Sequence, residues 1–301
     1  MKAAVRMSLQ ALRARTAQKL AALGFDPEET RCICEDVVRA TGEGHIAHGV
    51  GALYTLYYLN QLHPGRGRIR VKTRGAGFIE LTAPHHLGWL PAARAIDLLV
   101  NSAAAKLGPQ LAIVRSNGFC GRLGHLTAAI ARAGFVGIAM QATPPVLATP
   151  RTRTASLGTN PLAISVPAGG RTHPPTADVA LSGVSFATEF LRVIVSKAES
   201  IAPAPRPRTR PERLALSMLI QMVASSVVGT ELLPASEWGL VICTLPPLRK
   251  VGAHELHNWR RRLGLEFLPG ERSASVYAQA LRGRGVTLPH PIYRWLAATP
   301  T

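Results

Sequence analysis

The chain has few of the residues that mark several classes of protein. Aromatic residues make up 5% of its 301 residues and charged residues 17%. So few aromatics argue against a platform on which nucleic-acid bases stack. Little charge beside 47% hydrophobic residues argues against a disordered chain. Since no apolar run reaches the roughly 18 uncharged residues of a membrane span, we expect a folded protein without a membrane partner.

Acidic residues are especially scarce. The 17 Asp and Glu face 35 Lys and Arg, so the formal net charge is +18. Such a surplus suits phosphate neutralisation, but here the basic residues are scattered, with dense runs only at 206–210 and 260–262. We therefore expect no nucleic-acid partner. An acidic small molecule would still be attracted to this surface.

Cysteine is also rare. Cys32 and Cys34 form a C-x-C pair with no second pair nearby, so we expect free thiols and no bound metal. Residues 1–20 carry charges throughout and lack a continuous apolar stretch, which is not the pattern of a secretion signal. Together these features favour a location in the reducing cytoplasm.

Helical and strand patterns alternate along the chain, which predicts an α/β fold. A helix is expected over Ser8–Leu23, and Asp26 followed by Pro27 is typical of the start of a second. A pair of strands is predicted over Ile69–Leu81 and a helix over Gly88–Leu107.

We expect three consecutive regions. Residues 1–75 form a helical N-terminal region with a Gly/His loop and the first strand, and residues 76–204 a central α/β region. Residues 205–301 form a C-terminal helical region that packs back on the core.

Short segments spread over the chain resemble one known family. They are Gly44–Val50 (GHIAHGV), 114–125 (VRSNGFCGRLGH), 157–163 (LGTNPLA) with 178–182 (DVALS), and 268–272 (LPGER). Taken in order, they are similar to motifs of the type 2 malate/L-lactate dehydrogenase family. The resemblance implies a non-Rossmann α/β fold, with a mixed sheet, flanking helices and an active site near a homodimer interface. No G-x-G-x-x-G follows a predicted strand, which agrees.

The chain also departs from the family pattern. His48 matches the catalytic histidine, but Ala47 replaces its serine neighbour and Ala52 replaces an arginine that would clamp a carboxylate. The histidine of the second loop falls on Phe119. A nicotinamide cofactor needs close backbone approach and ordered polar partners. We therefore expect no cofactor, with NADPH or NADH as the alternative.

An acid–base reaction could use such a site without a redox cofactor. The chain is similar to the β-carboline-forming Pictet–Spengler offshoot of this fold, which condenses an aromatic amino acid (tryptophan) with an aldehyde or keto-aldehyde. The chemistry needs a carboxylate whose pKa is raised by burial. Asp97, within an apolar helix, is our candidate acid/base. His86 would assist dehydration, and His48 is the third candidate catalytic residue.

Five further residues are candidates for substrate binding. Arg74 and Arg70 would hold the carboxylate of the amino acid. Ser116, Asn117 and Asn160 would line the pocket, although Asn160 could instead cap the turn before a proline. Two alternatives stay open: NAD(P)H-dependent turnover of a 2-oxo or 2-hydroxy acid or a cyclic imine, and a catalytically silent scaffold.

Overall fold

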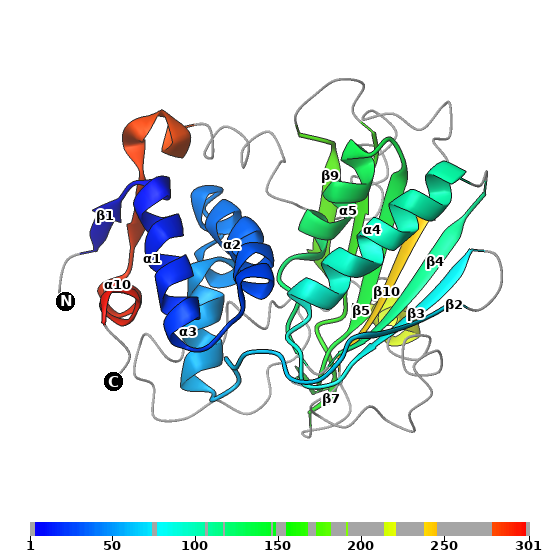
Figure 1. Ribbon diagram of the computed structural model, residues 1–301, viewed down its shortest axis with the longest axis horizontal. Helices are drawn as coiled ribbons and strands as arrows, with labels where there is room; N and C mark the ends of the chain where they lie inside the picture. Colours follow the sequence, from blue (N-terminus) through cyan, green and yellow to red (C-terminus); the bar gives the residue numbers. More distant parts are fainter. Residues whose placement is uncertain are drawn as a thin grey trace. The chain divides into compact units, whose positions relative to one another are not determined.

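The computed structural model divides the chain into two compact units. The first comprises Met1–Gly65, Phe186–Ile201 and Leu268–Thr301, and the second Arg66–Ser185 and Ala202–Phe267 (Figure 1). The residues that the structure describes are 4–73, 77–105, 108–116, 118–145, 147–148, 155–167, 173–181, 191, 214–220, 238–245 and 279–298.

The first unit is mainly helical. Its elements are β1 (Val5–Met7), α1 (Leu9–Ala22), α2 (Pro27–Gly42), the 3-10 turn η1 (Ile46–His48), α3 (Val50–Tyr58), the π-turn η2 (Ala280–Arg284), β11 (Val286–Leu288) and α10 (His290–Ala297). Strands β1 and β11 pair antiparallel. This pairing brings both ends of the chain into one unit, so the division differs from the three consecutive regions expected from the sequence.

Local caps start the first two helices where the sequence predicts them. The Ser8 side chain accepts a hydrogen bond from the Ala11 N–H at 3.1 Å. The Asp26 carboxylate accepts one from the Glu29 N–H at 2.9 Å, and Pro27 occupies the first helical position. Each cap satisfies a backbone donor that has no partner within its own helix.

A buried lysine ties the two ends of the first unit together. Lys19 on α1 donates to the Ala298 carbonyl at 2.9 Å, and its ammonium lies 5.3 Å from the ring centroid of Trp295 on α10. Burial lowers the pKa of Lys19, because the charged form loses water. The carbonyl and the aromatic face partly replace that water.

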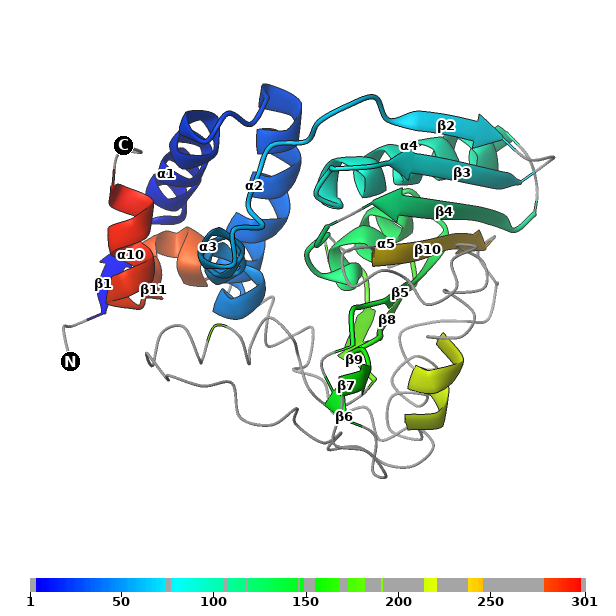
Figure 2. The ribbon, with the colours of Figure 1, turned by 90° about the horizontal axis from the view of Figure 1, so that it is seen from below.

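The second unit is built on a mixed seven-stranded sheet (Figure 2). In spatial order its strands are β2 (Arg70–Thr73), β3 (Phe78–Ala83), β4 (Gln110–Ser116), β10 (Trp238–Leu245), β5 (Val136–Ala142), β8 (Pro161–Ser165) and β9 (Thr176–Ala180). Strands β3 and β4 run parallel and the other neighbours antiparallel. A separate pair joins β6 (Leu147–Ala148) to β7 (Ala155–Leu157). The predicted α/β class and mixed sheet are confirmed.

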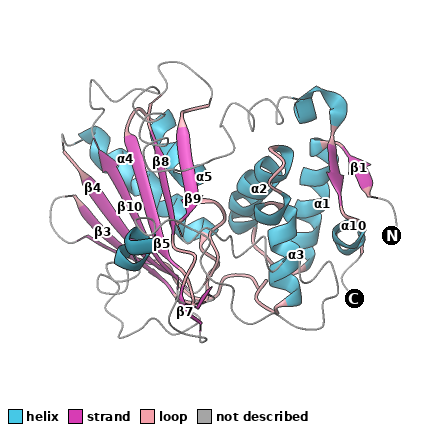
Figure 3. Cartoon of the chain, turned by 180° about the vertical axis from the view of Figure 1, so that it is seen from behind, coloured by secondary structure: helices cyan, strands magenta, loops and turns pink. Residues whose placement is uncertain are grey.

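Helices lie on both faces of this sheet (Figure 3). Helices α4 (Trp89–Ala105) and α5 (Leu123–Arg132) cover one face, and the helical residues 214–220 lie on the other. Among the described residues, no helix is both long and apolar enough to cross a membrane.

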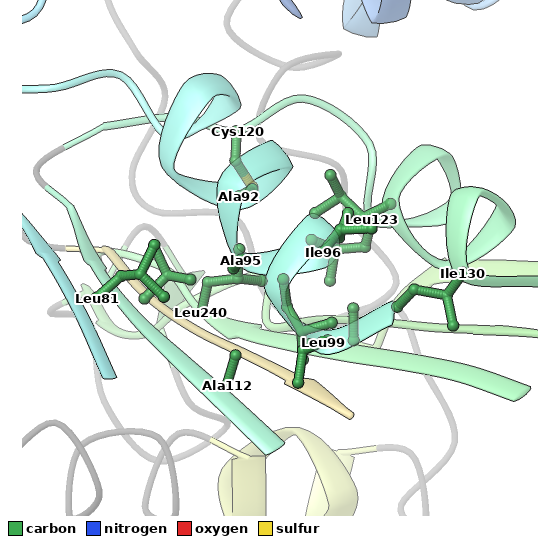
Figure 4. Packing of buried hydrophobic residues seen from close by; sticks show 14 of the residues in the cluster. Leu81, Ala92, Ala95, Ile96, Leu99, Ala112, Cys120, Leu123, Ile130 and Leu240 are labelled. Carbon is green, nitrogen blue, oxygen red and sulfur yellow. The ribbon is translucent and has the colours of Figure 1, made fainter. Parts of the chain in front are cut away.

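The main apolar core fills the space between the sheet and α4 and α5 (Figure 4). Alternate residues of the central strands, including Leu81, Val114 and Leu240, face the helices and are almost fully buried. Leu99 and Ile130 meet them from α4 and α5. Burying each such side chain stabilises the folded state by about 1.5–3 kcal/mol. The alternation of apolar residues along the strands therefore determines which face of the sheet packs against the helices.

We predict that Asp26→Ala lowers the free energy of unfolding by about 1 kcal/mol, because the Glu29 amide loses its acceptor. Urea denaturation monitored by circular dichroism measures the change. Asp26→Asn is the matched control, since its amide oxygen can still accept the bond. An equal loss in both variants would show that the capping hydrogen bond is not the cause.

Candidate functional site

His48 ends a short turn between two helices of the first unit. It is the last residue of η1, is half-buried and lies two residues before α3. The His45 N–H donates to the Ala40 carbonyl at 2.8 Å, which folds the turn back onto the end of α2. The Gly49 N–H donates to the His45 carbonyl, also at 2.8 Å. The predicted Gly/His loop is therefore an ordered turn that fixes the backbone beside the imidazole.

A small cavity lies beside this turn, within the first unit. It measures about 190 Å³ and is lined by Thr41, Gly42, Gly44, Ile46, Gln279, Ala280, Gly285, Val286 and Thr287. Pockets for drug-sized ligands are usually roughly 300–1,000 Å³, so this cavity is too small for a dinucleotide.

The second unit gathers several predicted residues at one edge of its sheet. Strands β3, β4, β5 and β9 run in one direction and all end there, while β2, β8 and β10 begin there. Ser116 is the last residue of β4, Arg70 the first of β2, and Asn160 directly precedes β8. His86 follows the end of β3 by three residues. Ligands of open α/β sheets commonly bind beyond the carboxyl ends of the strands, so this edge is the candidate site of the second unit.

His86 is held by backbone atoms at this edge. Its side chain is buried, with the Nε2 atom 3.1 Å from the Gly67 carbonyl oxygen. The His86 N–H also donates to the Ala83 carbonyl. This bonding gives the ring a structural task, and its proposed part in dehydration stays a prediction.

Asn160 is a buried clamp. Its side-chain oxygen accepts from the Thr143 N–H at 3.2 Å, and its amide nitrogen donates to both the carbonyl and the hydroxyl of Ser217 at 3.1 Å. The residue is fully buried and has a φ of 43°, which asparagine tolerates better than most residues. The amide thus joins the end of β5 to the helical residues 214–220.

Two glycines near this edge are packed closely against the protein's own atoms. A Cβ atom on Gly158 would overlap the Thr143 carbonyl oxygen. The Gly124 N–H, at the start of α5, donates to the Asp178 Oδ2 at 2.8 Å, and a Cβ there would lie 2.9 Å from the same oxygen. A phosphate at this helix start would meet a carboxylate instead of open N–H donors. These two places do not fit a nicotinamide dinucleotide.

One predicted residue, Asp97, is not in the expected setting. Asp97 is exposed on α4, which contradicts the burial on which its acid/base role depends. Arg70 is exposed on the edge strand β2. Phe119 is buried and packs edge-to-face on Trp89, with ring centroids 5.3 Å apart. Arg74 and Asn117 lie outside the described residues.

Sequence reasoning missed an ion pair on the sheet. The Arg115 Nε atom lies 3.0 Å from the Glu80 Oε1 atom, and the Glu80 residue is buried. In the strand register, Arg70 and Arg115 sit opposite Thr82 from its two sides. This register brings two guanidinium-bearing residues to one row near the candidate edge. The alternation of the apolar Val114 with the charged Arg115 along β4 was the signal that could have found it.

A reactive thiol and a metal site are the two other kinds of site to consider. Burial raises the pKa of Cys34 to about 11, so its thiol is not a nucleophile at neutral pH. Among the described residues, no three His, Cys, Asp or Glu side chains gather as a metal-binding group.

Comparison with known proteins gives related sequences. The family model for malate/L-lactate dehydrogenase matches residues 7–193. A malate dehydrogenase of Pyrococcus abyssi (strain GE5 / Orsay) is 29% identical over 187 residues, which are 60% of this chain and 49% of that protein. The chain therefore spans about half the length of this curated relative.

Solved structures share the fold over almost the whole chain. A dehydrogenase from Sinorhizobium meliloti superposes with a TM-score of 0.80 at 22% identity, covering 99% of this chain and 98% of that one. A delta1-piperideine-2-carboxylate reductase from Pseudomonas syringae pvar. tomato gives 0.74 at 20% identity, covering 97% and 98%. With the family model matching well over half of the residues, and the Gly/His turn inside the match, the chain belongs to the malate/L-lactate dehydrogenase family.

Proposed function

We propose that the protein is an oxidoreductase that interconverts a 2-oxo acid and a 2-hydroxy acid, or reduces a cyclic imine, with NADH or NADPH as the hydride donor. The observation that carries the proposal is the family match over residues 7–193, which includes the His48 turn. Because Gly158 and the start of α5 are filled by the protein's own atoms, the dinucleotide would be held by other residues.

His48 is the residue to which we assign proton transfer. Reduction of a carbonyl leaves an alkoxide that must gain a proton, and the imidazole is the side chain whose ordinary pKa lies nearest neutrality. The hydrogen bonds of the His45–Gly49 turn hold its backbone. His48 would therefore supply the proton to the substrate oxygen, and take it back when the hydroxy acid is oxidised.

The positive charge of the chain supports an acidic substrate. Of the two arginines in one row of its sheet, Arg70 is exposed and Arg115 is paired with Glu80. A guanidinium binds a carboxylate through two parallel hydrogen bonds. The net charge of +18 would attract such an anion over a longer range. We propose that the substrate carries a carboxylate, which this positive charge would attract.

Cofactor-independent condensation is less well supported. The Pictet–Spengler prediction assigns the proton transfers to a carboxylate desolvated within α4, and Asp97 is exposed there. We therefore favour the redox reaction.

We predict that the full chain consumes NADH or NADPH when given 2-oxo acids or a cyclic imine. We also predict that His48→Asn lowers kcat by about 100-fold or more. The loss follows from removal of the proton donor, and absorbance of the reduced cofactor measures the rate. His63→Asn is the control, because His63 is an exposed histidine of the same unit.

Two outcomes would contradict the proposal. One is the absence of turnover with both cofactors across these substrates. The other is β-carboline formation from tryptophan and a keto-aldehyde without any cofactor, which would restore the condensation reaction.

A further prediction concerns the buried side-chain amide of Asn160. Asn160→Ala should lower the free energy of unfolding by roughly 1–3 kcal/mol, because the buried Thr143 N–H is left without its acceptor. The KM for the dinucleotide should stay near that of the wild type. Asn60→Ala is a matched control, since Asn60 also has a positive φ, of 53°, but is exposed. A stable Asn160→Ala variant with a raised cofactor KM would mean that Asn160 binds the cofactor.

A further inference from the structure

We infer that Thr41 is a positioning residue for His48: its hydroxyl caps α3 from outside that helix and fixes the turn that carries the imidazole. The inference rests on the proposed function, because it assumes that His48 transfers a proton. Thr41 lies in the last turn of α2 and is almost fully buried.

The Thr41 hydroxyl makes two hydrogen bonds. The Val50 N–H, the first amide of α3, donates to the Thr41 Oγ1 at 2.9 Å. The same oxygen donates its proton to the Val37 carbonyl at 2.8 Å. Val50 is fully buried, so its amide would otherwise be an unsatisfied donor in the core. The hydroxyl thus joins the end of α2 to the start of α3.

Helix α3 needs a capping side chain from another helix, because its own N-cap residue supplies none. Its own N-cap residue is Gly49, which makes no side-chain capping bond. A Cβ at this position would overlap the Thr41 Oγ1 and would lie 2.8 Å from the Thr41 backbone nitrogen. The φ of Gly49 is −93°, so the glycine is required here for space and not for a left-handed backbone. The hydroxyl occupies the place where a capping side chain would begin.

The cap at the start of α3 also bears on the position of the His48 imidazole. His48 precedes Gly49, so a shift of the start of α3 would move His48 with it. A Cβ on Gly51 would lie 2.6 Å from the Ile46 carbonyl, which shows how closely α3 packs on the turn. The cavity of about 190 Å³ next to Thr41, Gly44 and Ile46 leaves space into which a released turn could relax. Misplacing a catalytic group by about 1 Å can cost roughly 100-fold in rate.

The test compares Thr41→Val, which keeps the shape and loses the hydroxyl, with Thr41→Ser, which keeps the hydroxyl. We expect Thr41→Val to lower kcat about tenfold and to leave the KM for the reduced dinucleotide within about twofold. Thr41→Ser should retain most of the wild-type kcat. Circular dichroism and urea unfolding establish that the assay is run on folded protein.

Three results would overturn the inference. They are an unchanged kcat in Thr41→Val, an equal loss in Thr41→Ser, and a loss in Thr41→Val that adds fully to that of His48→Asn in the double variant. If Thr41→Val does not fold, hydrogen exchange of the Val50 amide in the wild type decides: protection is expected, and exchange at the rate of an open loop would overturn the cap.

The same set separates this inference from the proposed function. Full activity in His48→Asn would refute the assignment of proton transfer to His48, and the Thr41 inference would fall with it as a statement about catalysis. A large loss in His48→Asn beside a normal Thr41→Val would refute the Thr41 inference alone.

Discussion

A buried N–H at the start of a helix has no acceptor within that helix. In two helices of this protein, a side chain from another segment accepts its hydrogen bond. Helix α3 follows Gly49, and α5 follows Arg122, which makes no capping bond through its side chain. The Val50 amide is bonded by Thr41, and the Gly124 amide by Asp178. In both cases a side chain from another segment supplies the acceptor, so the start of the helix is tied to a second part of the fold.

These bonds give a physical reason for two of the family-like segments. GHIAHGV ends at the amide bonded by Thr41, and DVALS begins with the carboxylate that caps α5. A carboxylate also suits the positive end of the α5 dipole. It removes the N–H donor that a phosphate would need there. At this place the family-like segment DVALS therefore forms a helix cap.

Much of the fold follows from local patterns in the sequence. Ser8 and Asp26 start helices where their types predict, and the alternating segment around Ile79 forms a strand. The pairing of β1 with β11 joins residues near opposite ends of the chain, and no local pattern contains it. The short β6, β7 and β9 lie in or directly after a stretch rich in proline and glycine, residue types that are typical of loops.

The predicted burial of Asp97 is wrong because of the geometry of its helix. Buried residues of α4 recur at helical spacing, including Ala92, Ala95, Ile96 and Leu99. Asp97 and Leu98 fall between them and are exposed. An apolar neighbour in sequence is not a neighbour in space on a helix. Composition along the sequence was therefore a poor guide to the burial of Asp97, whereas the role proposed for His48 stays a prediction.

The packing of the second loop bears on how the protein could work. Phe119 fills the space beside Trp89, and its carbonyl accepts the Gly88 N–H at 2.9 Å. A side chain at Gly118 would lie 2.9 Å from the Leu87 Cα, so the loop is closed against its neighbour. This loop, which resembles the one that carries the family's second histidine, contributes packing at Phe119 instead of an imidazole. In the proposed reaction His48 would supply the proton, and the rate of such a step is sensitive to the position of the donor. The hydroxyl of Thr41 would matter to this reaction, because it accepts a hydrogen bond from the first amide of α3 and so holds the backbone next to His48.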